Sequence, residues 1–403
     1  MNDNPENDRR ETRAKALRGL KDRALDTAAE GIAISDLSAR DNQLIYVNSG
    51  FERLTGYKAE EVLGRNCRFL QGPETDPATA EKISQALHDR SECTVEILNY
   101  RKDGTTFWNR LSLTPVCYES DSVTHYIGVQ SDVTARRAAE DALRTANSNI
   151  RAGLQAGAKI QQALLPSSPP EIPGATIRWR FQPCEELAGD IFNVFHLKDG
   201  KLVVYLLDVV GHGVPAALLS VTLSRVLSPE VQKLSPEDKG EETLAAFESP
   251  LSVANRLNRQ FPFDLEKRQF FTMLYGVLDV PGRVFRYVSA GHPPIIHADA
   301  SGQARILKSA GLPVGIEASP GYEEQEVSLQ AGERLFLYTD GLPEAMDAGD
   351  VAFGTERLLQ ALSAPGVALD EILASAMKAV RQWTGNKGLT DDASIVGIES
   401  TDL

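Results

Sequence analysis

The stretch Gly64-Arg-Asn-Cys-Arg-Phe-Leu-Gln-Gly72 surrounds one cysteine, Cys67, with side chains that can bind a ligand. The chain has four cysteines, Cys67, Cys93, Cys117 and Cys184, and no two of them form a C-x-x-C pair. A disulfide framework or a structural zinc site is therefore not supported. Taken alone, Cys67 would be a small buried apolar residue. Its polar neighbours make it instead a candidate for ligand chemistry.

Short strand-like runs lie on both sides of this stretch. They are rich in β-branched and aromatic residues, and we expect strands at Ile32–Ser35, Leu44–Val47, Val95–Tyr100, Thr106–Pro115 and His125–Gln130. Helices are expected at Ser49–Leu54 and Ala78–His88, and the pairs Asp41-Asn42 and Asp103-Gly104 supply turns. Residues 25–134 are therefore expected to form a small α+β domain.

The nine-residue stretch resembles the signature of LOV (light, oxygen, voltage) photosensor domains, which belong to the PAS family. The resemblance covers residues 25–134 and continues at Pro73-Glu-Thr-Asp76, Asn99-Tyr100, Phe107-Trp-Asn109 and Ile127-Gly-Val-Gln130. It implies bound FMN and a blue-light reaction in which the Cys67 thiol adds reversibly to the flavin ring. The cofactor-binding residues that it implies are Asn66, Cys67, Arg68, Gln71, Asn99, Asn109 and Gln130.

The polar side chains of this set suit different parts of a flavin. Asn99, Asn109 and Gln130 each carry a donor and an acceptor, as the pyrimidine edge of the flavin ring requires. Arg68 and the neighbouring Gln71 are placed for the flavin phosphate. Many LOV domains carry a second phosphate-binding arginine where this chain has Ser84. That difference leaves open whether FMN or another flavin is bound.

Helical patterns flank the first domain. Residues 1–24 carry a thin apolar stripe that predicts an N-terminal helix. Residues 135–165 show a seven-residue repeat of small and apolar residues. One register contains Leu143, Ile150, Gly157 and Leu164, and the other contains Ala139, Ala146, Gly153 and Ile160. The repeat predicts either a weak parallel coiled coil, which would make the protein a homodimer, or a solvated linker helix. We favour the coiled coil.

A second domain is expected at residues 166–403, after the helix-breaking segment Pro166-Ser-Ser-Pro-Pro-Glu-Ile-Pro173. Strands are predicted at Lys201–Leu207, Phe271–Leu278, Val284–Ser289, Arg334–Tyr338 and Ala393–Ile398. Helices are predicted at Val214–Leu227, Leu251–Gln260, Thr355–Leu362 and Leu369–Trp383. Residues 229–248 are charged and weakly patterned, which predicts a surface insertion.

Four aspartates of this domain lie at ends of predicted strands or in turns: Asp190, Asp208, Asp340 and Asp391. Taken singly, each would be a turn residue or a helix cap. Mg²⁺ and Mn²⁺ prefer oxygen ligands, and converging carboxylates can hold two such ions about 3.5–4 Å apart. Metal-bound water becomes a nucleophile near neutral pH. Together, the four acids predict a two-metal site that hydrolyses phosphate esters.

These motifs, in this order, resemble the PPM (protein phosphatase 2C-like) family of serine/threonine phosphatases, and its SpoIIE-like branch in particular. The match covers residues 160–400 and includes Ile160-Gln-Gln-Ala-Leu-Leu-Pro166, Ser289-Ala-Gly-His-Pro-Pro294 and Phe353-Gly-Thr-Glu-Arg-Leu358. The resemblance implies an α/β sandwich of two antiparallel sheets flanked by helices. It also implies two bound Mn²⁺ or Mg²⁺ ions. The residues that it implies both as metal ligands and as catalytic residues are Asp190, Asp208, Asp340 and Asp391. The Val209 carbonyl is implied as a further ligand.

Three other residues of the second domain receive less definite roles. Asp392 is expected beside the metal ligands rather than among them. His212 and His292 are each either a catalyst or a packed hydrogen-bonding residue, because both uses of histidine are common after a strand.

The charge balance of the chain excludes some classes of partner. The 42 Lys and Arg residues against 56 Asp and Glu give a net charge of −14. Such an acidic chain is not expected to bind nucleic acid or anionic membranes. The sequence has no run of 18 apolar residues and no signal-peptide core at its start, so we expect a cytoplasmic protein.

The two resemblances together predict a blue-light-regulated protein phosphatase. Its substrate would carry phosphoserine or phosphothreonine, and SpoIIE-like enzymes commonly act on an anti-sigma-factor antagonist in partner-switching pathways. A light-sensing histidine kinase is one alternative, although residues 135–165 contain no histidine. A non-catalytic light-gated scaffold is the other, and the loss of a metal-binding aspartate would favour it. None of the four predicted metal-binding aspartates is missing from this sequence.

Overall fold

A computed structural model describes residues 13–402, except 14–15, 18, 22, 118–122, 229–245, 264–268 and 309–310. The chain divides into two compact units, Met1–Ser148 and Asn149–Leu403, and each is described by itself. The described positions between 13 and 27 are helical, but much of the predicted helix at 1–24 lies outside the described residues. The same holds for most of the predicted insertion at 229–248.

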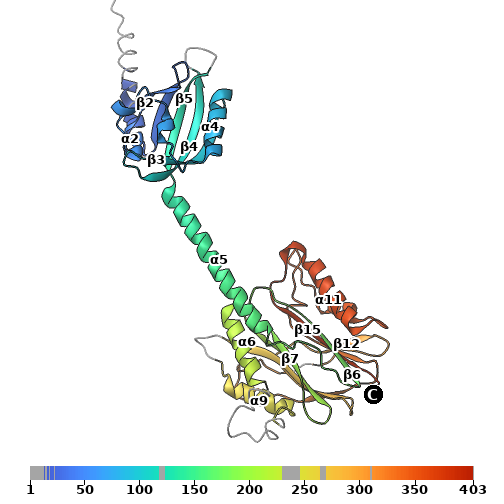
Figure 1. Ribbon diagram of the computed structural model, residues 1–403. Coiled ribbons are helices and arrows are strands. Elements are labelled where there is room, and N and C mark those ends of the chain that lie inside the picture. The colour runs from blue at the N-terminus through green and yellow to red at the C-terminus, as the bar shows by residue number, and fades with distance from the viewer. Residues whose placement is uncertain are drawn as a thin grey trace, which may run out of the picture. The chain divides into compact units, whose positions relative to one another are not determined.

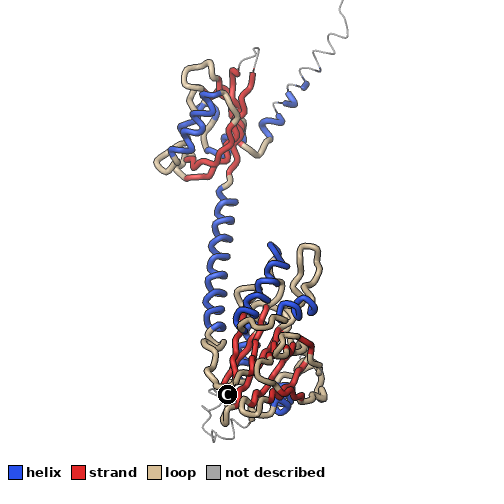
Figure 2. The backbone as a smooth tube through the Cα atoms, turned by 90° about the vertical axis from the view of Figure 1, so that its right-hand side faces the viewer, coloured by secondary structure: helices blue, strands red, loops and turns tan. Residues whose placement is uncertain are grey.

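The N-terminal unit contains a five-stranded antiparallel sheet in the order β2-β1-β5-β4-β3. Its strands are β1 (Gly31–Asp36), β2 (Gln43–Val47), β3 (Cys93–Tyr100), β4 (Thr106–Cys117) and β5 (Val123–Asp132). Its helices are α2 (Ser49–Thr55), α3 (Ala59–Val62), the 3₁₀ helix η1 (Cys67–Leu70) and α4 (Pro77–Asp89). Figure 2 draws the strands in red and the helices in blue. The alternating apolar residues of the sequence therefore form one sheet with helices packed against it.

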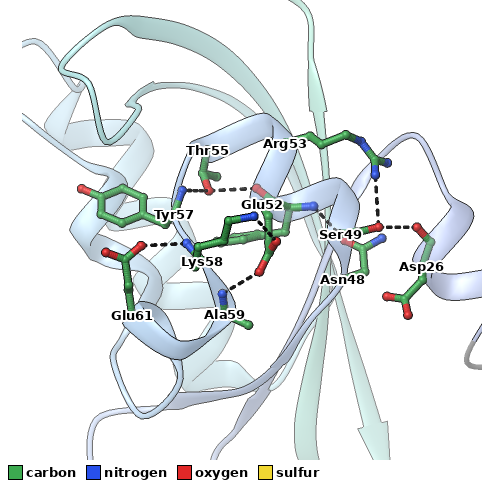
Figure 3. A network of polar contacts seen from close by, with 11 residues as sticks. Asp26, Asn48, Ser49, Glu52, Arg53, Thr55, Tyr57, Lys58, Ala59 and Glu61 are labelled. Carbon is green, nitrogen blue, oxygen red and sulfur yellow. Dashed lines mark hydrogen bonds and ion pairs between the residues drawn. The ribbon is translucent and has the colours of Figure 1, made fainter.

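The start of α2 is fixed by one buried side chain, Asn48. Its Oδ1 accepts from the Phe51 amide at 2.8 Å, which caps the helix. Its Nδ2 donates to the Leu25 carbonyl at 2.8 Å. Figure 3 shows Asn48 beside Ser49, whose hydroxyl donates to the Asp26 carbonyl. These bonds tie the end of the N-terminal helical segment to α2.

A long helix, α5 (Thr134–Gln162), follows the sheet. Its first turn is held on the N-terminal unit, where the Arg137 guanidinium stacks 3.7 Å from the Trp108 ring centre. Three heptad residues are exposed in the single chain: Leu143 is 63%, Ile150 60% and Ile160 69% exposed. Leu164, near the end of the repeat, is half-buried against the core of the C-terminal unit. The helix is therefore present as predicted, and the coiled coil remains a prediction.

The C-terminal unit contains two five-stranded sheets, in the orders β13-β10-β9-β8-β7 and β12-β11-β14-β15-β6. All neighbouring strands in both sheets are antiparallel. The first sheet consists of β7 (Ile191–His196), β8 (Lys201–Val209), β9 (Phe271–Asp279), β10 (Val284–Ala290) and β13 (Gln325–Ser328). The second consists of β6 (Ala175–Gln182), β11 (Ile296–Ala298), β12 (Ala304–Ile306), β14 (Arg334–Tyr338) and β15 (Ala393–Ser400).

Three apolar layers hold this unit together. Residues such as Phe192, Leu206 and Leu337 form the layer between the two sheets. The first sheet is covered by α6 (Val214–Val226) and α9 (Pro250–Gln260), and the second by α10 (Thr355–Leu362) and α11 (Leu369–Thr384). Figure 1 shows α6 and α9 on one side of the strands and α11 on the other. The predicted fold class, an α+β sensor unit and a sandwich of two antiparallel sheets flanked by helices, is confirmed.

Candidate functional site

The N-terminal unit contains a cavity of about 250 Å³. Apolar side chains that include Leu70, Ile83 and Ile97 form much of its wall. All seven predicted flavin-binding residues line it as well: Asn66, Cys67, Arg68, Gln71, Asn99, Asn109 and Gln130. The cavity thus combines an apolar wall with a few polar groups, as small-molecule sites do.

Three buried amides form the polar edge of this cavity. Asn99, Asn109 and Gln130 lie on the neighbouring strands β3, β4 and β5 and are 4%, 1% and 1% exposed. Asn109 Nδ2 donates to Asn99 Oδ1 at 2.9 Å and to Gln130 Oε1 at 3.1 Å. Among the described residues, the buried Asn109 Oδ1 has no hydrogen-bond partner. A buried acceptor without a partner is costly, so this oxygen fits the ring N–H of a bound flavin.

Cys67 begins η1, and Gln130 Nε2 lies 3.9 Å from its Sγ atom. Burial raises the pKa of the Cys67 thiol to about 11, and the weak hydrogen bond from Gln130 opposes this only in part. The side chain is therefore a protonated thiol at neutral pH. Because the thiolate is the nucleophilic form, the resting cysteine is unreactive.

Arg68, one of the residues predicted to bind the flavin phosphate, lines the cavity and is exposed. The Arg68 side chain is 64% exposed and pairs with Asp41 Oδ1 at 2.7 Å. Asn66 is engaged by the backbone, because its Oδ1 accepts from the Arg68 amide and its Nδ2 donates to the Asp41 carbonyl. Ser84 lines the cavity and bonds the Ala80 carbonyl of its own helix. Among the described residues that line the cavity, Arg68 is therefore the one arginine that could bind a phosphate.

In the C-terminal unit, the four predicted aspartates come from four strand ends. Asp190 immediately precedes β7 and Asp208 is the last but one residue of the antiparallel neighbour β8. Asp340 follows β14, and Asp391 precedes its antiparallel neighbour β15. The start of one antiparallel strand and the end of the next lie at the same edge of a sheet. The fold thereby gathers carboxylates from both sheets.

The gathered carboxylates perturb one another. Burial, and then the charges of Asp340 and Asp391, raise the pKa of Asp208 to about 8. Burial and the Asp391 charge raise the pKa of Asp340 to about 6. Burial and the Asp208 charge raise the pKa of Asp190 well above its ordinary value. Such crowded oxygen donors fit hard divalent cations, which would neutralise their charge.

Two neutral side chains orient Asp190, which is 2% exposed. Thr339 Oγ1 and Ser394 Oγ donate to its Oδ2 at 2.8 and 2.5 Å. Neither residue was predicted, although Ser394 ends the segment Thr390-Asp-Asp-Ala-Ser394 that contains Asp391. Hydroxyl groups at such positions fix the rotamer of a carboxylate by hydrogen bonding to one of its oxygens.

Asp392 holds the backbone that leads to Asp190. Its Oδ1 accepts from the Cys184 amide at 2.8 Å and its Oδ2 from the Gly189 amide at 2.6 Å. The Val209 carbonyl lies beside Gly189, because a Cβ atom on that glycine would be 2.8 Å from the oxygen. The expected role of Asp392, beside the metal ligands rather than among them, stays a prediction.

Glu344 is an acid that the sequence analysis missed. Its charge contributes to the raised pKa values of Asp208, Asp340 and Asp391. Its amide donates to the Asp340 carbonyl at 2.8 Å, within the turn that follows β14. The signal available in the sequence was a carboxylate four residues after Asp340, on a loop rather than a strand.

The two histidines occupy different surroundings. His212 is exposed, and its Nδ1 lies 2.9 Å from Glu185 Oε1. His292 is buried beside Thr272, whose hydroxyl is 2.8 Å from the His292 Nδ1. Burial lowers the pKa of His292 to about 3, so its ring is neutral at physiological pH.

The raised pKa of Asp208 predicts how stability depends on pH without metal. The folded carboxyl binds its proton more tightly than the unfolded chain does, with a pKa of about 8 against 3.8. The protonated Asp208 carboxyl therefore adds to the free energy of unfolding at acid pH. This contribution is lost as the pH rises through about 8. In chelator, we expect Asp208→Asn to unfold at a higher temperature than the parent, by a margin that widens between about pH 5 and pH 8.

Calorimetry of both proteins measures this margin, and subtraction removes the effect of groups that Asp208 does not influence, such as His292. Saturating Mn²⁺ should shrink or reverse the margin, because the parent then gains a bound cation and the variant gains less. A margin that stays constant with pH would contradict the electrostatic description of Asp208.

Both units match known families. A family model described as Stage II sporulation protein E (SpoIIE) matches residues 198–401, which is more than half of the chain, and a PAS domain model matches residues 29–135. The SiaA-PP2C domain of Pseudomonas aeruginosa is 20% identical with a TM-score of 0.51, over 63% of this chain and 98% of that one. That likeness shows the fold of the C-terminal unit.

Curated relatives match the N-terminal unit. A blue-light photoreceptor of Listeria monocytogenes is 45% identical over 28% of this chain and 44% of its own length. The bacterioopsin transcriptional activator of Halobacterium salinarum is 42% identical over 32% of this chain and 19% of its own length. The chain thus spans less than half of each relative.

In the part of the chain that the structure describes, no helix is long and apolar enough to cross a membrane. The phosphatase match leaves the histidine kinase alternative without support in the C-terminal unit. The chain belongs to the SpoIIE family, and it joins a SpoIIE-type, PP2C-like phosphatase domain to a PAS domain of the LOV type.

Proposed function

We propose that the protein is a blue-light-regulated, metal-dependent phosphatase of phosphoserine or phosphothreonine proteins. The observation that carries the enzymatic part is the cluster of buried aspartates with raised pKa values at the strand ends of a SpoIIE-family unit. The cavity lined by Cys67 and the partnerless Asn109 oxygen supports the light-sensing part.

Asp190, Asp208, Asp340 and Asp391, with the Val209 carbonyl, would hold two Mn²⁺ or Mg²⁺ ions and are the proposed catalytic residues. Bound divalent cations would supply hydroxide at neutral pH and bind phosphoryl oxygens. Thr339 and Ser394 fix the Asp190 carboxylate, and Asp392 fixes the backbone before it. Asp340 and Asp391 are half-buried, so solvent and a phosphorylated side chain could reach these two carboxylates more easily than the buried Asp190.

FMN is the proposed cofactor of the N-terminal unit, and Asn66, Cys67, Arg68, Gln71, Asn99, Asn109 and Gln130 would bind it. A bound flavin would supply blue-light absorption next to the Cys67 thiol. Gln130 touches both Asn109 and Cys67. It also lies on β5, which ends at Asp132 just before α5. A changed hydrogen bond at Gln130 can therefore reach the start of α5 along a single strand.

The proposed physiological substrate is an anti-sigma-factor antagonist in the cytoplasm, as is common for SpoIIE-like enzymes. The test is phosphate release from a phosphoserine protein of this class, in darkness and in blue light, with Mn²⁺ or with chelator. We expect turnover that requires the metal and differs between light and dark. No release under any condition would favour a non-catalytic scaffold, and equal release in light and dark would remove the regulatory part.

We also propose a parallel homodimer through α5, because its heptad residues Leu143 and Ile150 are exposed in the single chain. Replacing both with Asn should weaken the dimer, since each buried apolar side chain contributes about 1.5–3 kcal/mol. Light-scattering mass should then fall towards that of one chain, and the light/dark activity ratio should approach one. Flavin bleaching should remain normal.

The matched control is Thr145→Asn with Ala152→Asn, which adds two asparagines to the same helix outside the heptad seam. This control should keep the mass and the light/dark ratio of the parent. If the seam variant also keeps both, α5 is a solvated linker helix.

A further inference from the structure

The wall of the cavity in the N-terminal unit carries very little charge. Among the described residues that line it, Arg68 alone is charged at neutral pH. Its guanidinium pairs with Asp41 Oδ1 at 2.7 Å, and the two side chains are 64% and 56% exposed. An opposite charge at this distance cancels much of the attraction that Arg68 exerts on an anion. A phosphate that approaches Arg68 therefore meets a pair of zero net charge.

The polar residues near Arg68 add no second cation. Ser84 of α4 lines the cavity, and its hydroxyl donates to the Ala80 carbonyl of the same helix at 3.2 Å. Asn66 Oδ1 accepts from the Arg68 amide, and Asn66 Nδ2 donates to the Asp41 carbonyl. Gln71 also lines the cavity and is exposed to solvent. The groups available to a phosphate are thus neutral overall and accessible to water.

The three amides of the cavity differ from this group because they are buried. Asn99, Asn109 and Gln130 are at most 4% exposed, and Asn109 Oδ1 has no hydrogen-bond partner among the described residues. A buried polar group that loses its partner costs more free energy than an exposed ion pair contributes. Most of the affinity for a flavin should therefore come from its ring, which riboflavin and FMN share.

We infer that the cavity binds riboflavin nearly as tightly as FMN, and that Asp41 is the residue that limits its preference for the phosphorylated flavin. This inference rests on the proposed flavin cofactor. Exposed ion pairs contribute at most about 1 kcal/mol, which corresponds to about fivefold in affinity. The Kd values of the parent protein for riboflavin and FMN should therefore differ by less than about fivefold.

The test titrates the full-length chain, freed of flavin, with riboflavin or FMN in darkness and follows flavin fluorescence. Asp41→Asn removes the charge that faces Arg68. The variant should keep the turn, because Asp41 has a φ of 68° and asparagine tolerates this conformation. We expect it to bind FMN about fivefold more tightly than the parent does and riboflavin equally well.

The matched control for Asp41→Asn is Glu92→Gln. Glu92 is exposed and does not line the cavity, and the substitution removes one negative charge from the chain in the same way. Both flavins should bind this control as they bind the parent. Equal FMN affinity in Asp41→Asn and Glu92→Gln would contradict the role of Asp41.

Two further variants test the phosphate contacts without changing Asp41. Ser84→Arg places a second guanidinium at the cavity wall, so FMN should bind at least about tenfold more tightly, and added salt should reduce this gain. Arg68→Gln should weaken FMN binding by less than about fivefold. A parent that binds FMN more than about tenfold more tightly than riboflavin would overturn the inference, and so would a tenfold loss of FMN affinity in Arg68→Gln.

Failure of the proposed function gives a separate signature. A parent that binds both flavins but shows no bleaching in blue light contradicts the light-sensing proposal, while the ratio of the two Kd values still decides the role of Asp41. A parent that binds neither flavin overturns both.

Discussion

Asp208→Asn is expected to lower phosphate release by roughly 100-fold or more, because it removes a charge from the centre of the proposed two-metal site. Asp340, Asp391, Asp392 and Glu344 all act on the pKa of Asp208, so this carboxylate lies within the field of the whole cluster. Asparagine has nearly the same shape, and the register of β8 with β9 at Thr272 should persist. The measurement is kcat/KM across a Mn²⁺ titration.

The matched control for this loss is Asp402→Asn, since the Asp402 side chain is 97% exposed and lies outside the cluster. It makes the same chemical change and should retain parental turnover. High Mn²⁺ should restore part of the activity of Asp208→Asn if weak metal binding is the cause. Parental turnover in Asp208→Asn at low Mn²⁺ would contradict the two-metal proposal.

Cys67→Ala is expected to keep its flavin but to lose the reversible bleaching of the blue absorption band altogether. The cavity wall and the amides Asn99, Asn109 and Gln130 remain in this variant, so binding should persist. The light/dark ratio of phosphate release should fall to one. Absorption spectra before and after blue light measure the first effect, and phosphate release measures the second.

Cys93→Ala is the control for that experiment. Cys93 begins β3 but does not line the cavity, so its replacement should leave bleaching and recovery as in the parent. If Cys67→Ala bleaches and recovers like Cys93→Ala, the thiol of Cys67 is not the photochemical group.

Within the described residues, each predicted strand and helix corresponds to an element of the structure. Strands of three or four residues, such as β11 (Ile296–Ala298) and β13 (Gln325–Ser328), were missed because too few side chains alternate. Two longer strands, β6 (Ala175–Gln182) and β7 (Ile191–His196), were also missed. β6 is an edge strand in which Arg178 and Arg180 alternate with apolar residues, and this composition gives a weak apolar signal. β7 is apolar along most of its length, so its composition does not explain why it was missed.

The candidate sites show the same division between local and tertiary information. Carboxylates at strand ends and polar residues around Cys67 could be predicted because each lies in a short motif. The contacts between distant residues could not. Nothing near Gln161 in the sequence separates it from the exposed Gln162, since its burial depends on Ala188 and on Ser220 of another helix. The pairing of Arg68 with Asp41 likewise depends on how η1 packs.

The raised pKa of the Cys67 thiol has a consequence for oxidative damage. Peroxides and disulfides react with the thiolate form of cysteine. With a pKa of about 11, roughly one Cys67 side chain in ten thousand is ionised at pH 7. Cys117, in contrast, is exposed at the end of β4. Under oxidant stress, sulfenic acid should therefore form at Cys117 long before Cys67 is damaged, and the capacity to respond to light should outlast the first oxidation of the protein.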